Sequence, residues 1–337
     1  MITLKNIPKL SISILKAILG NKIPLKVTQY ITFNCNFNCA YCGRKNIKTL
    51  ELTTNEIKKY IDEFKKMGTM FWSFNGGECL LRNDLGELID YVKQKGMKCN
   101  IVTNGILVPE RIDWLKNIDL VITSIDGPKN IQDKIRGAGV FEKNLKALEI
   151  LAKNKIKTVV VSVISNENID SLEEILKIVS EYGHYWDVQP IITHRSDKEN
   201  NAEKFRFDEQ KFKEIINWII NKKREGAPIF SAFEYLEDIQ RFPNCKANSN
   251  CWAGRLFCAI SPDGLIYPCA EFIGTELFKQ KIDNFQIRNA FEKIPDMSKC
   301  KECYFSCYSE YNLILNNKTK SIFRICKNLM LGKWFWS

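Results

Sequence analysis

The regular alternation of strand and helix patterns between residues 27 and 192 constrains this chain more than any other feature of its sequence. The first helical pattern begins at a capping box, Thr53-x-x-Glu56. Segments rich in β-branched and aromatic residues, which are typical of strands, occur at residues 27–33, 69–74, 98–103, 120–125, 157–164 and 185–192. Serial βα units form parallel sheets with right-handed crossovers. We therefore predict an α/β fold whose sheet is either open or partly rolled into a barrel.

The thirteen cysteines of this 337-residue chain point to metal rather than to disulfides. No run of eighteen apolar residues could cross a bilayer, and residues 1–20 lack the apolar core and cleavage site of a signal peptide. We therefore expect a cytoplasmic protein, in a compartment where thiols stay reduced. Clustered cysteines in that setting favour metal binding.

Three of these cysteines, Cys35, Cys39 and Cys42, directly follow the first predicted strand and so lie at its carboxyl end. Thiolates within eight residues of one another can converge on one inorganic centre, and they favour zinc or an iron–sulfur cluster. Three ligands leave a fourth coordination position open. The spacing alone also permits a three-cysteine zinc site or a coincidence.

The pattern Cys35-x3-Cys39-x2-Cys42, placed after the first strand of a βα series, resembles the radical S-adenosylmethionine (SAM) superfamily. The resemblance implies a partial (β/α)6 TIM-like barrel, a [4Fe–4S] cluster held by these three cysteines, and SAM chelated by the fourth iron. Reductive cleavage of SAM would then yield a 5′-deoxyadenosyl radical that abstracts hydrogen from an unactivated C–H bond of the substrate. A low-potential electron donor such as flavodoxin or ferredoxin is the implied partner.

Two further sites carry this resemblance, a glycine motif and an aromatic position. Gly76-Gly77-Glu78 ends the second predicted strand and matches the GGE motif of the family, in which glycines allow close backbone approach and Glu78 would meet the methionine ammonium. Tyr41 matches the aromatic position that packs on adenine, although an ordinary loop aromatic would look the same.

Other residues that could contact SAM lie at or near the ends of later predicted strands. Asn104 follows the third strand, and Ser124 and Asp126, at the end of the fourth, are candidates for the ribose and amino group. Arg136 could meet the SAM carboxylate bidentately, and Gln189 in the sixth strand is a weaker candidate. The Asn-Gly and Asp-Gly pairs here are also common turn formers.

A second cysteine group resembles the SPASM or twitch extension of radical SAM enzymes, which binds one or two auxiliary [4Fe–4S] clusters. Its candidate metal ligands are Cys251, Cys258, Cys269, Cys300, Cys303, Cys307 and Cys326. Seven cysteines do not complete two sets of four. Either two clusters form and one has an open iron, which is our expectation, or one cluster forms and some cysteines are structural. A zinc ribbon would leave three cysteines unexplained.

One carboxylate and three cysteines lie outside these patterns. Glu271 stands two residues after Cys269, where related dehydrogenases keep a proton-accepting carboxylate, and is the candidate catalytic base. A solvated surface glutamate is the alternative. Cys79, Cys99 and Cys245 are expected to be packing residues.

The net charge of +11 belongs to the two ends of the chain, since residues 1–50 and 311–337 contain no acidic residue. A basic amphipathic helix is predicted near residues 10–19, and residues 327–337 combine lysines with tryptophans. Such segments suit an anionic membrane surface, or else they pack on the protein itself or on a partner subunit. No basic–aromatic pattern through the body of the chain suggests nucleic acid.

These patterns divide the chain into five regions and leave the substrate open. The predicted regions are an amphipathic segment, the barrel, a helical linker, the auxiliary cluster domain and an aromatic tail, at residues 1–26, 27–195, 196–244, 245–326 and 327–337. The first hypothesis is radical chemistry on a lipid or isoprenoid-like substrate by a cytoplasmic protein peripheral to the inner face of the membrane. The alternative is maturation of a ribosomally made peptide, although only 34 residues precede Cys35, fewer than a separate precursor-binding domain needs. A pure electron carrier would not need a SAM-binding barrel.

Overall fold

One curved sheet contains all eight strands of a computed structural model that describes residues 7–44, 47–193, 195, 201–243, 250–282, 286–301 and 304–316. The strands are β1 (Lys26–Tyr30), β2 (Phe71–Asn75), β3 (Lys98–Val102), β4 (Leu120–Ser124), β5 (Thr158–Ile164), β6 (Tyr185–Pro190), β7 (Phe257–Ile260) and β8 (Ile266–Tyr267). Their order is β6-β5-β4-β3-β2-β1-β7-β8. Strands β1 to β6 pair in parallel with their neighbours in sequence, which confirms the predicted partial barrel.

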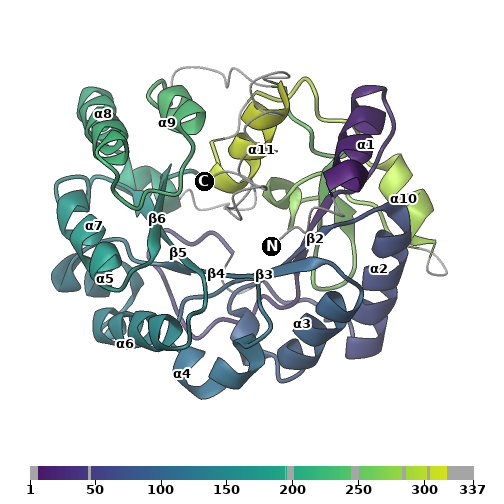
Figure 1. The fold of residues 1–337 in the computed structure, drawn as a ribbon, viewed down its shortest axis with the longest axis horizontal. Coiled ribbons are helices and arrows are strands. Elements are labelled where there is room, and N and C mark those ends of the chain that lie inside the picture. The colour runs from purple at the N-terminus through teal and green to yellow at the C-terminus, as the bar shows by residue number, and fades with distance from the viewer. Residues whose placement is uncertain are drawn as a thin grey trace.

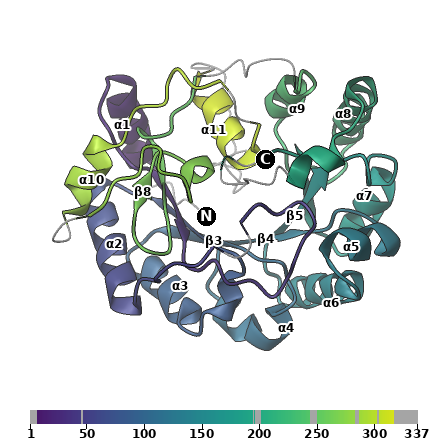
Figure 2. The same cartoon turned by 180° about the vertical axis from the view of Figure 1, so that it is seen from behind.

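Helices cover the convex side of this sheet and one helix faces its concave side (Figures 1 and 2). The α-helices are α1 (Ile7–Ile18), α2 (Thr54–Met67), α3 (Leu85–Gln94), α4 (Val108–Arg111), α5 (Lys129–Arg136), α6 (Val140–Lys153), α7 (Leu172–Glu181), α8 (Glu209–Arg224), α9 (Phe233–Ile239), α10 (Ile287–Lys293) and α11 (Ser306–Asn316). Short 3-10 helices are η2 (Cys79–Leu81), η3 (Ile112–Leu115), η4 (Asn201–Phe205) and η5 (Ala270–Phe272). No described helix is long and apolar enough to cross a membrane.

Local chemistry explains where α2 begins and ends. Thr53 caps the helix by accepting from the amide of Glu56, and the Glu56 carboxylate accepts from the Thr53 amide at 2.8 Å. Gly68 ends the helix with a φ of 107°, a left-handed conformation that favours glycine. The capping box predicted from the sequence is therefore present.

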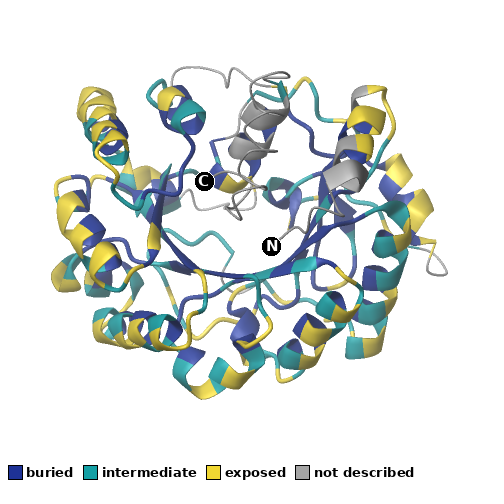
Figure 3. Cartoon of the chain, viewed as in Figure 1, coloured by how far each residue is buried: buried dark blue, intermediate teal, exposed yellow. Residues whose placement is uncertain are grey.

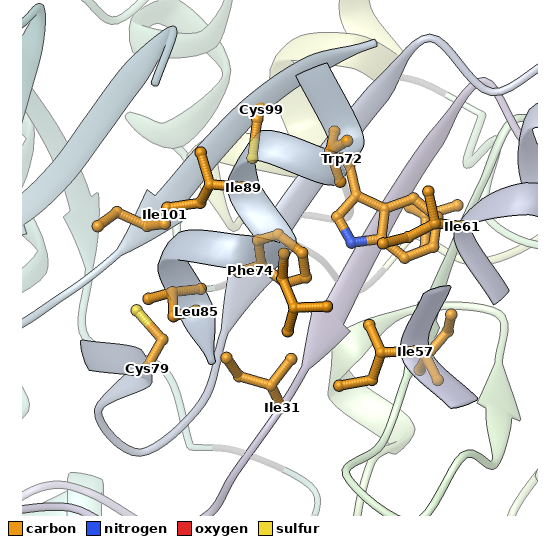
Figure 4. Close-up of a cluster of buried hydrophobic side chains, with 14 of the residues drawn as sticks. Ile31, Ile57, Ile61, Trp72, Phe74, Cys79, Leu85, Ile89, Cys99 and Ile101 are labelled. Carbon is orange, nitrogen blue, oxygen red and sulfur yellow. The ribbon is translucent and has the colours of Figure 1, made fainter. Parts of the chain in front are cut away.

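The main core lies between the sheet and the helices of its convex side (Figure 4). Trp72 and Phe74 of β2 pack there against Ile57 and Ile61 of α2, all fully buried. Figure 3 shows the strands buried and the outer faces of the helices exposed. Cys79 and Cys99 belong to this core, as predicted for packing cysteines, whereas Cys245 lies outside the described residues.

The cysteine-rich C-terminal region continues the barrel sheet, although the sequence predicted a separate small domain. β7 pairs in parallel with β1, with Lys26 opposite Phe257, and β8 pairs antiparallel with β7. α1 also packs on this region, since Ile14 and Ala17 share a buried cluster with Phe257. The two regions therefore share one sheet and its hydrophobic contacts, because β1 presents a free edge that β7 fills.

Candidate active site

The loop after β1, residues 31–44, holds Cys35, Cys39 and Cys42 at the carboxyl end of the strand and is here called the cysteine loop. The Cys42 amide donates to the Cys39 carbonyl at 3.1 Å, and the Ala40 amide donates to the Ile135 carbonyl at 2.9 Å. Burial raises the pKa of Cys39 to about 11, with Cys42 and Cys35 adding to the rise and Arg136 opposing it. The three thiols are therefore near enough to influence one another.

Gly76 and Gly77 pack directly on the cysteine loop. A Cβ on Gly76 would lie 2.6 Å from the Thr32 carbonyl oxygen, and one on Gly77 would lie 2.6 Å from that of Phe33. The Gly77 amide donates to the Thr32 carbonyl at 2.9 Å. Close approach does require these glycines, but the backbone they approach is the cysteine loop of the protein itself.

Glu78 differs from the prediction, because both of its carboxylate oxygens accept from protein donors. Oε1 accepts from the Leu80 amide at 2.9 Å and from Thr103 Oγ1 at 2.8 Å, and Oε2 accepts from the Asn104 amide at 2.6 Å. Burial raises the pKa of this carboxyl, and these hydrogen bonds oppose the rise. The side chain therefore joins the ends of β2 and β3, and we assign it a positioning role rather than contact with the methionine ammonium.

Three predicted SAM contacts form a buried network with one another. Tyr41 Oη donates to Asp126 Oδ2 at 2.7 Å, and Arg136 donates through Nε to the same oxygen at 2.7 Å and through Nη2 to Tyr41 Oη at 2.7 Å. The ion pair Arg136–Asp126 is almost completely buried. This network ties α5 to the cysteine loop. The Nε and Nη2 atoms of Arg136, expected to bind a SAM carboxylate, therefore already donate to acceptors within the protein.

The remaining predicted contacts lie at the carboxyl ends of their strands. Asn104 Nδ2 donates to Asn36 Oδ1 at 2.6 Å and lies 4.0 Å from Cys35 Sγ. Ser124 and Gln189 line a cavity of about 300 Å³ on the concave side of the sheet, here called the central cavity. The parallel strands bring these side chains to the same side of the barrel as the cysteine loop.

The central cavity follows the strands and is lined along its length by both apolar and polar side chains, among them Lys26 and Lys98 at the starts of β1 and β3. Phe71 and Leu120, at the starts of β2 and β4, line one end, and Asn75 and Ser124, at the ends of the same strands, line the other. Ser306, Cys307 and Tyr308 of α11 also line it, and α11 faces the concave side of the sheet in both ribbon views. A substrate of mixed polarity suits such a cavity.

Three of the predicted auxiliary ligands meet in a second, smaller pocket of about 40 Å³, here called the auxiliary pocket. Cys251, Cys269 and Cys300 line it together with Glu271 and Met297. Burial raises the pKa of Cys251 to about 11 and also raises that of Cys269, and the neighbouring thiols add to both shifts. These three cysteines therefore form one group.

Two predicted ligands lie elsewhere and two are outside the described residues. Cys258 points from β7 into the main core, where burial alone raises its pKa, because alternate residues of a strand face opposite sides of the sheet. Cys307 lines the central cavity and not the auxiliary pocket. Cys303 and Cys326 are outside the described residues. Cys258 is therefore not placed to bind the auxiliary cluster. Among the five candidate ligands that the structure describes, only three meet, so they do not form two separate groups of thiols.

Glu271 is only partly exposed, and its neighbour Arg44 was not among the residues predicted from the sequence. Glu271 Oε1 lies 3.7 Å from Arg44 Nη2, and the two side chains are 13% and 10% exposed. Arg44 also donates to the Ala270 carbonyl at 2.6 Å and stacks on Tyr30, with 4.8 Å between its guanidinium carbon and the ring centroid. In the sequence, only its position two residues after Cys42 could have marked Arg44 as a candidate site residue.

The donor sets of both sites suit iron–sulfur clusters better than single ions. Among the residues that the structure describes, no three cysteine, histidine or carboxylate side chains converge closely enough to ligate one metal ion. A four-iron cluster is larger, so its ligands stand further apart, and thiolates are its usual ligands. Because the cysteine loop supplies three thiols, it leaves one iron of such a cluster available to another ligand.

A comparison with family models decides the assignment, since residues 30–179 match the Radical SAM superfamily. Residues 30–179 form a radical SAM domain. The predicted SAM-binding [4Fe–4S] cluster and SAM itself are thereby supported as cofactors of this domain. The cysteine loop lies within the matched residues.

Two kinds of curated protein are among the relatives of this chain. Mycofactocin maturase MftC of Mycolicibacterium smegmatis is 28% identical over 260 residues, which cover 74% of this chain. The match spans 65% of the length of that maturase, somewhat less than two thirds. AdoMet-dependent heme synthase of Methanosarcina barkeri is 26% identical over 312 residues, which cover 82% of this chain and 86% of the synthase.

Solved structures share the fold of this radical SAM protein. SuiB of Streptococcus suis, bound to S-adenosylmethionine, superposes with a TM-score of 0.66 at 16% identity, over 79% of this chain and 66% of SuiB. The enzyme anSMEcpe, bound to AdoMet and a peptide, gives a TM-score of 0.63 at 17% identity, over 92% and 99% of the two chains. These likenesses confirm the predicted partial-barrel α/β fold.

Proposed function

We propose that this protein is a radical SAM enzyme that abstracts hydrogen from a peptide substrate held in the central cavity. The observation that carries the proposal is the placement of three thiols on the loop after β1, at the strand ends where Ser124 and Gln189 line the cavity. When bound, the cluster supplies the electron that cleaves SAM and so starts the radical chemistry. A flavodoxin or ferredoxin is the proposed reductant.

The residues around the cysteine loop would hold it rigid during that chemistry. Gly76 and Gly77 pack on its backbone, Glu78 ties it to the β3 turn, and the buried Arg136–Asp126 pair ties Tyr41 to α5. A preorganised loop keeps the reacting groups in place without further reordering. The walls of the central cavity would exclude water from the substrate radical.

The peptide assignment draws on what related proteins are named for. MftC is a mycofactocin maturase, and SuiB has been solved with its precursor peptide. A heme synthase is also among the relatives and spans more of this chain. We favour a peptide because the central cavity, at about 300 Å³, suits one side chain and its flanking backbone better than a whole tetrapyrrole.

A membrane-associated lipid substrate is the second candidate, and one surface of α1 favours it. Ile12, Leu15 and Leu19 are 53%, 57% and 73% exposed, and their spacing places them on one side of the helix. Lys16 is exposed beside them. The aromatic tail predicted to join this surface lies outside the described residues, and neither kind of relative is named for a lipid.

The test of the proposed activity is 5′-deoxyadenosine formation by anaerobically reconstituted protein with dithionite and SAM. Replacing Cys35, Cys39 and Cys42 together with Ala should reduce the yield at least a hundredfold, because the triad supplies the thiolates of the SAM cluster. Cys79→Ala is the matched control, since Cys79 is buried in the core. Unchanged yield from the triple variant would refute the proposal.

A further inference from the structure

Arg44 carries hydrogen-bond donors that nothing in the described part of the chain uses. Its Nε and Nη1 atoms are buried and have no acceptor there, and together they hold three of the five N–H bonds of a guanidinium. Its Nη2 donates to the Ala270 carbonyl, and the Glu271 carboxylate stands 3.7 Å away. Leaving buried charged donors without acceptors is unfavourable, so the site is incomplete without a ligand.

The position of Arg44 indicates where that ligand is. Arg44 lines the central cavity, as Tyr30 and Tyr308 do, whereas none of the three thiols of the cysteine loop does. Stacking on Tyr30 and the bond to the Ala270 carbonyl hold the guanidinium in place. Arg44 is therefore fixed at the wall of the central cavity before any ligand enters.

The charges around Arg44 favour a ligand with a single negative charge, since the two lysines that line the cavity already have partners, Lys98 in Asp119 and Lys26 in the Cys307 carbonyl. Glu271 stands next to Arg44, and Asp187 lines the same cavity. A dianionic phosphate would meet both acids, whereas a single carboxylate offers two acceptor oxygens with less repulsion, and guanidinium–carboxylate pairs have strong, defined geometry.

We propose that Arg44 binds a carboxylate of the substrate in the central cavity, as a terminal or side-chain carboxylate of a peptide. This inference rests on the proposed function, which supplies the class of substrate. Arg44 would thereby set which carbon of the substrate lies nearest the cysteine loop. The other source of a carboxylate is the methionine part of SAM, and the experiment separates the two.

Binding of two matched probes to the reconstituted holoprotein tests the proposal by anaerobic isothermal titration calorimetry. N-acetyl-L-phenylalanine and its amide differ in the carboxylate, and their ring can contact the apolar side chains of Phe71 and Leu120 that line the cavity. The wild-type protein should bind the acid about tenfold more tightly than the amide. Arg44→Gln should abolish the preference. Arg44→Lys should leave only part of it, because Lys keeps the charge without the planar fork.

Lys98→Gln is the matched control, since Lys98 lines the same cavity but is already paired with Asp119 at 2.7 Å. It should keep the preference for the acid. Thermal melting checks that each variant folds. If Arg44→Gln does not fold, the comparison is made with Arg44→Lys alone. Equal binding of acid and amide by the wild type, absence of binding by both, or an unchanged preference in both Arg44 variants would overturn the proposal.

Adding saturating SAM identifies the source of the carboxylate. A substrate site keeps its preference for the acid when SAM is bound. If SAM abolishes the preference and Arg44→Gln weakens SAM binding, Arg44 serves the SAM carboxylate and the proposal is overturned. Failure of the proposed function would give a different result. In that case the protein would form no 5′-deoxyadenosine but would still bind the acid more tightly than the amide.

Discussion

At the scale of single residues, the structure assigns structural roles to several groups that the sequence marked as ligand contacts. Glu78 binds Thr103 and the Asn104 amide, and Arg136 binds Asp126. Each carboxylate is buried, and a buried charge needs partners that remain in place. A residue that lines the central cavity and has unmet donors is instead Arg44, which no family motif marked.

His184 provides a residue-scale prediction about pH. Burial lowers its pKa below the usual 6.5, and the bond between Nε2 and the Leu148 carbonyl at 2.9 Å opposes this only in part. The unfolded chain therefore takes up a proton below about pH 6.5 that the folded chain does not. The free energy of unfolding should fall as the pH falls from 7.5 to 5.5, by at most about 1.4 kcal/mol, because this window reaches one pH unit below the unfolded pKa.

Denaturant unfolding at several pH values, with His184→Gln as the comparison, checks this prediction. The variant should show a flatter dependence over the same range, because Gln keeps a donor for the Leu148 carbonyl and does not titrate. Identical pH dependence in the two proteins would contradict the assignment.

At the scale of elements, β7 separates cysteines that the sequence grouped together. Cys258 and Ile260 face the main core, while Phe257 and Ala259 face the concave side. Cys251 and Cys269 flank the β7–β8 hairpin and meet Cys300 in the auxiliary pocket. We therefore propose one auxiliary cluster, with Cys303 as its fourth ligand by its spacing from Cys300.

Iron and sulfide counting after anaerobic reconstitution tests this arrangement. The wild type should hold about eight irons per chain, four for each of two clusters. Cys269→Ala should lower the count to about four, whereas Cys258→Ala, the matched control on the neighbouring strand, should keep about eight. A Cys258→Ala protein with four irons, or a wild type with twelve, would contradict the single auxiliary cluster.

At the scale of the whole molecule, the N-terminal helix and the C-terminal region hold each other against the barrel. Ile14 and Ala17 of α1 are buried there, and Arg255 donates to the Ala17 carbonyl at 3.4 Å. The opposite side of α1 exposes Ile12, Leu15 and Leu19. One side of the predicted amphipathic helix therefore packs on the protein itself, and the other is left for a partner or a surface.

Co-sedimentation with lipid vesicles tests whether that surface places the molecule at a membrane. With anionic vesicles at low salt, the wild type should sediment and its bound fraction should fall several-fold at high salt, since basic residues contribute about 1 kcal/mol each. Replacing Ile12, Leu15 and Leu19 with Gln should reduce the bound fraction further. Protein that stays in the supernatant under all conditions would exclude the membrane hypothesis.

The sequence by itself determined the order of strands and helices, the capping box of α2 and the place of the cysteine loop, because these depend on neighbours within a few residues. Cys35, Cys39 and Cys42 were identifiable for the same reason. Only the tertiary structure decided that Cys258 faces the core and that Arg44 meets Ala270, 226 residues away along the chain. The side of the sheet that each β7 side chain faces, and contacts between residues so far apart in sequence, are set when β7 pairs with β1. No local pattern encodes that pairing.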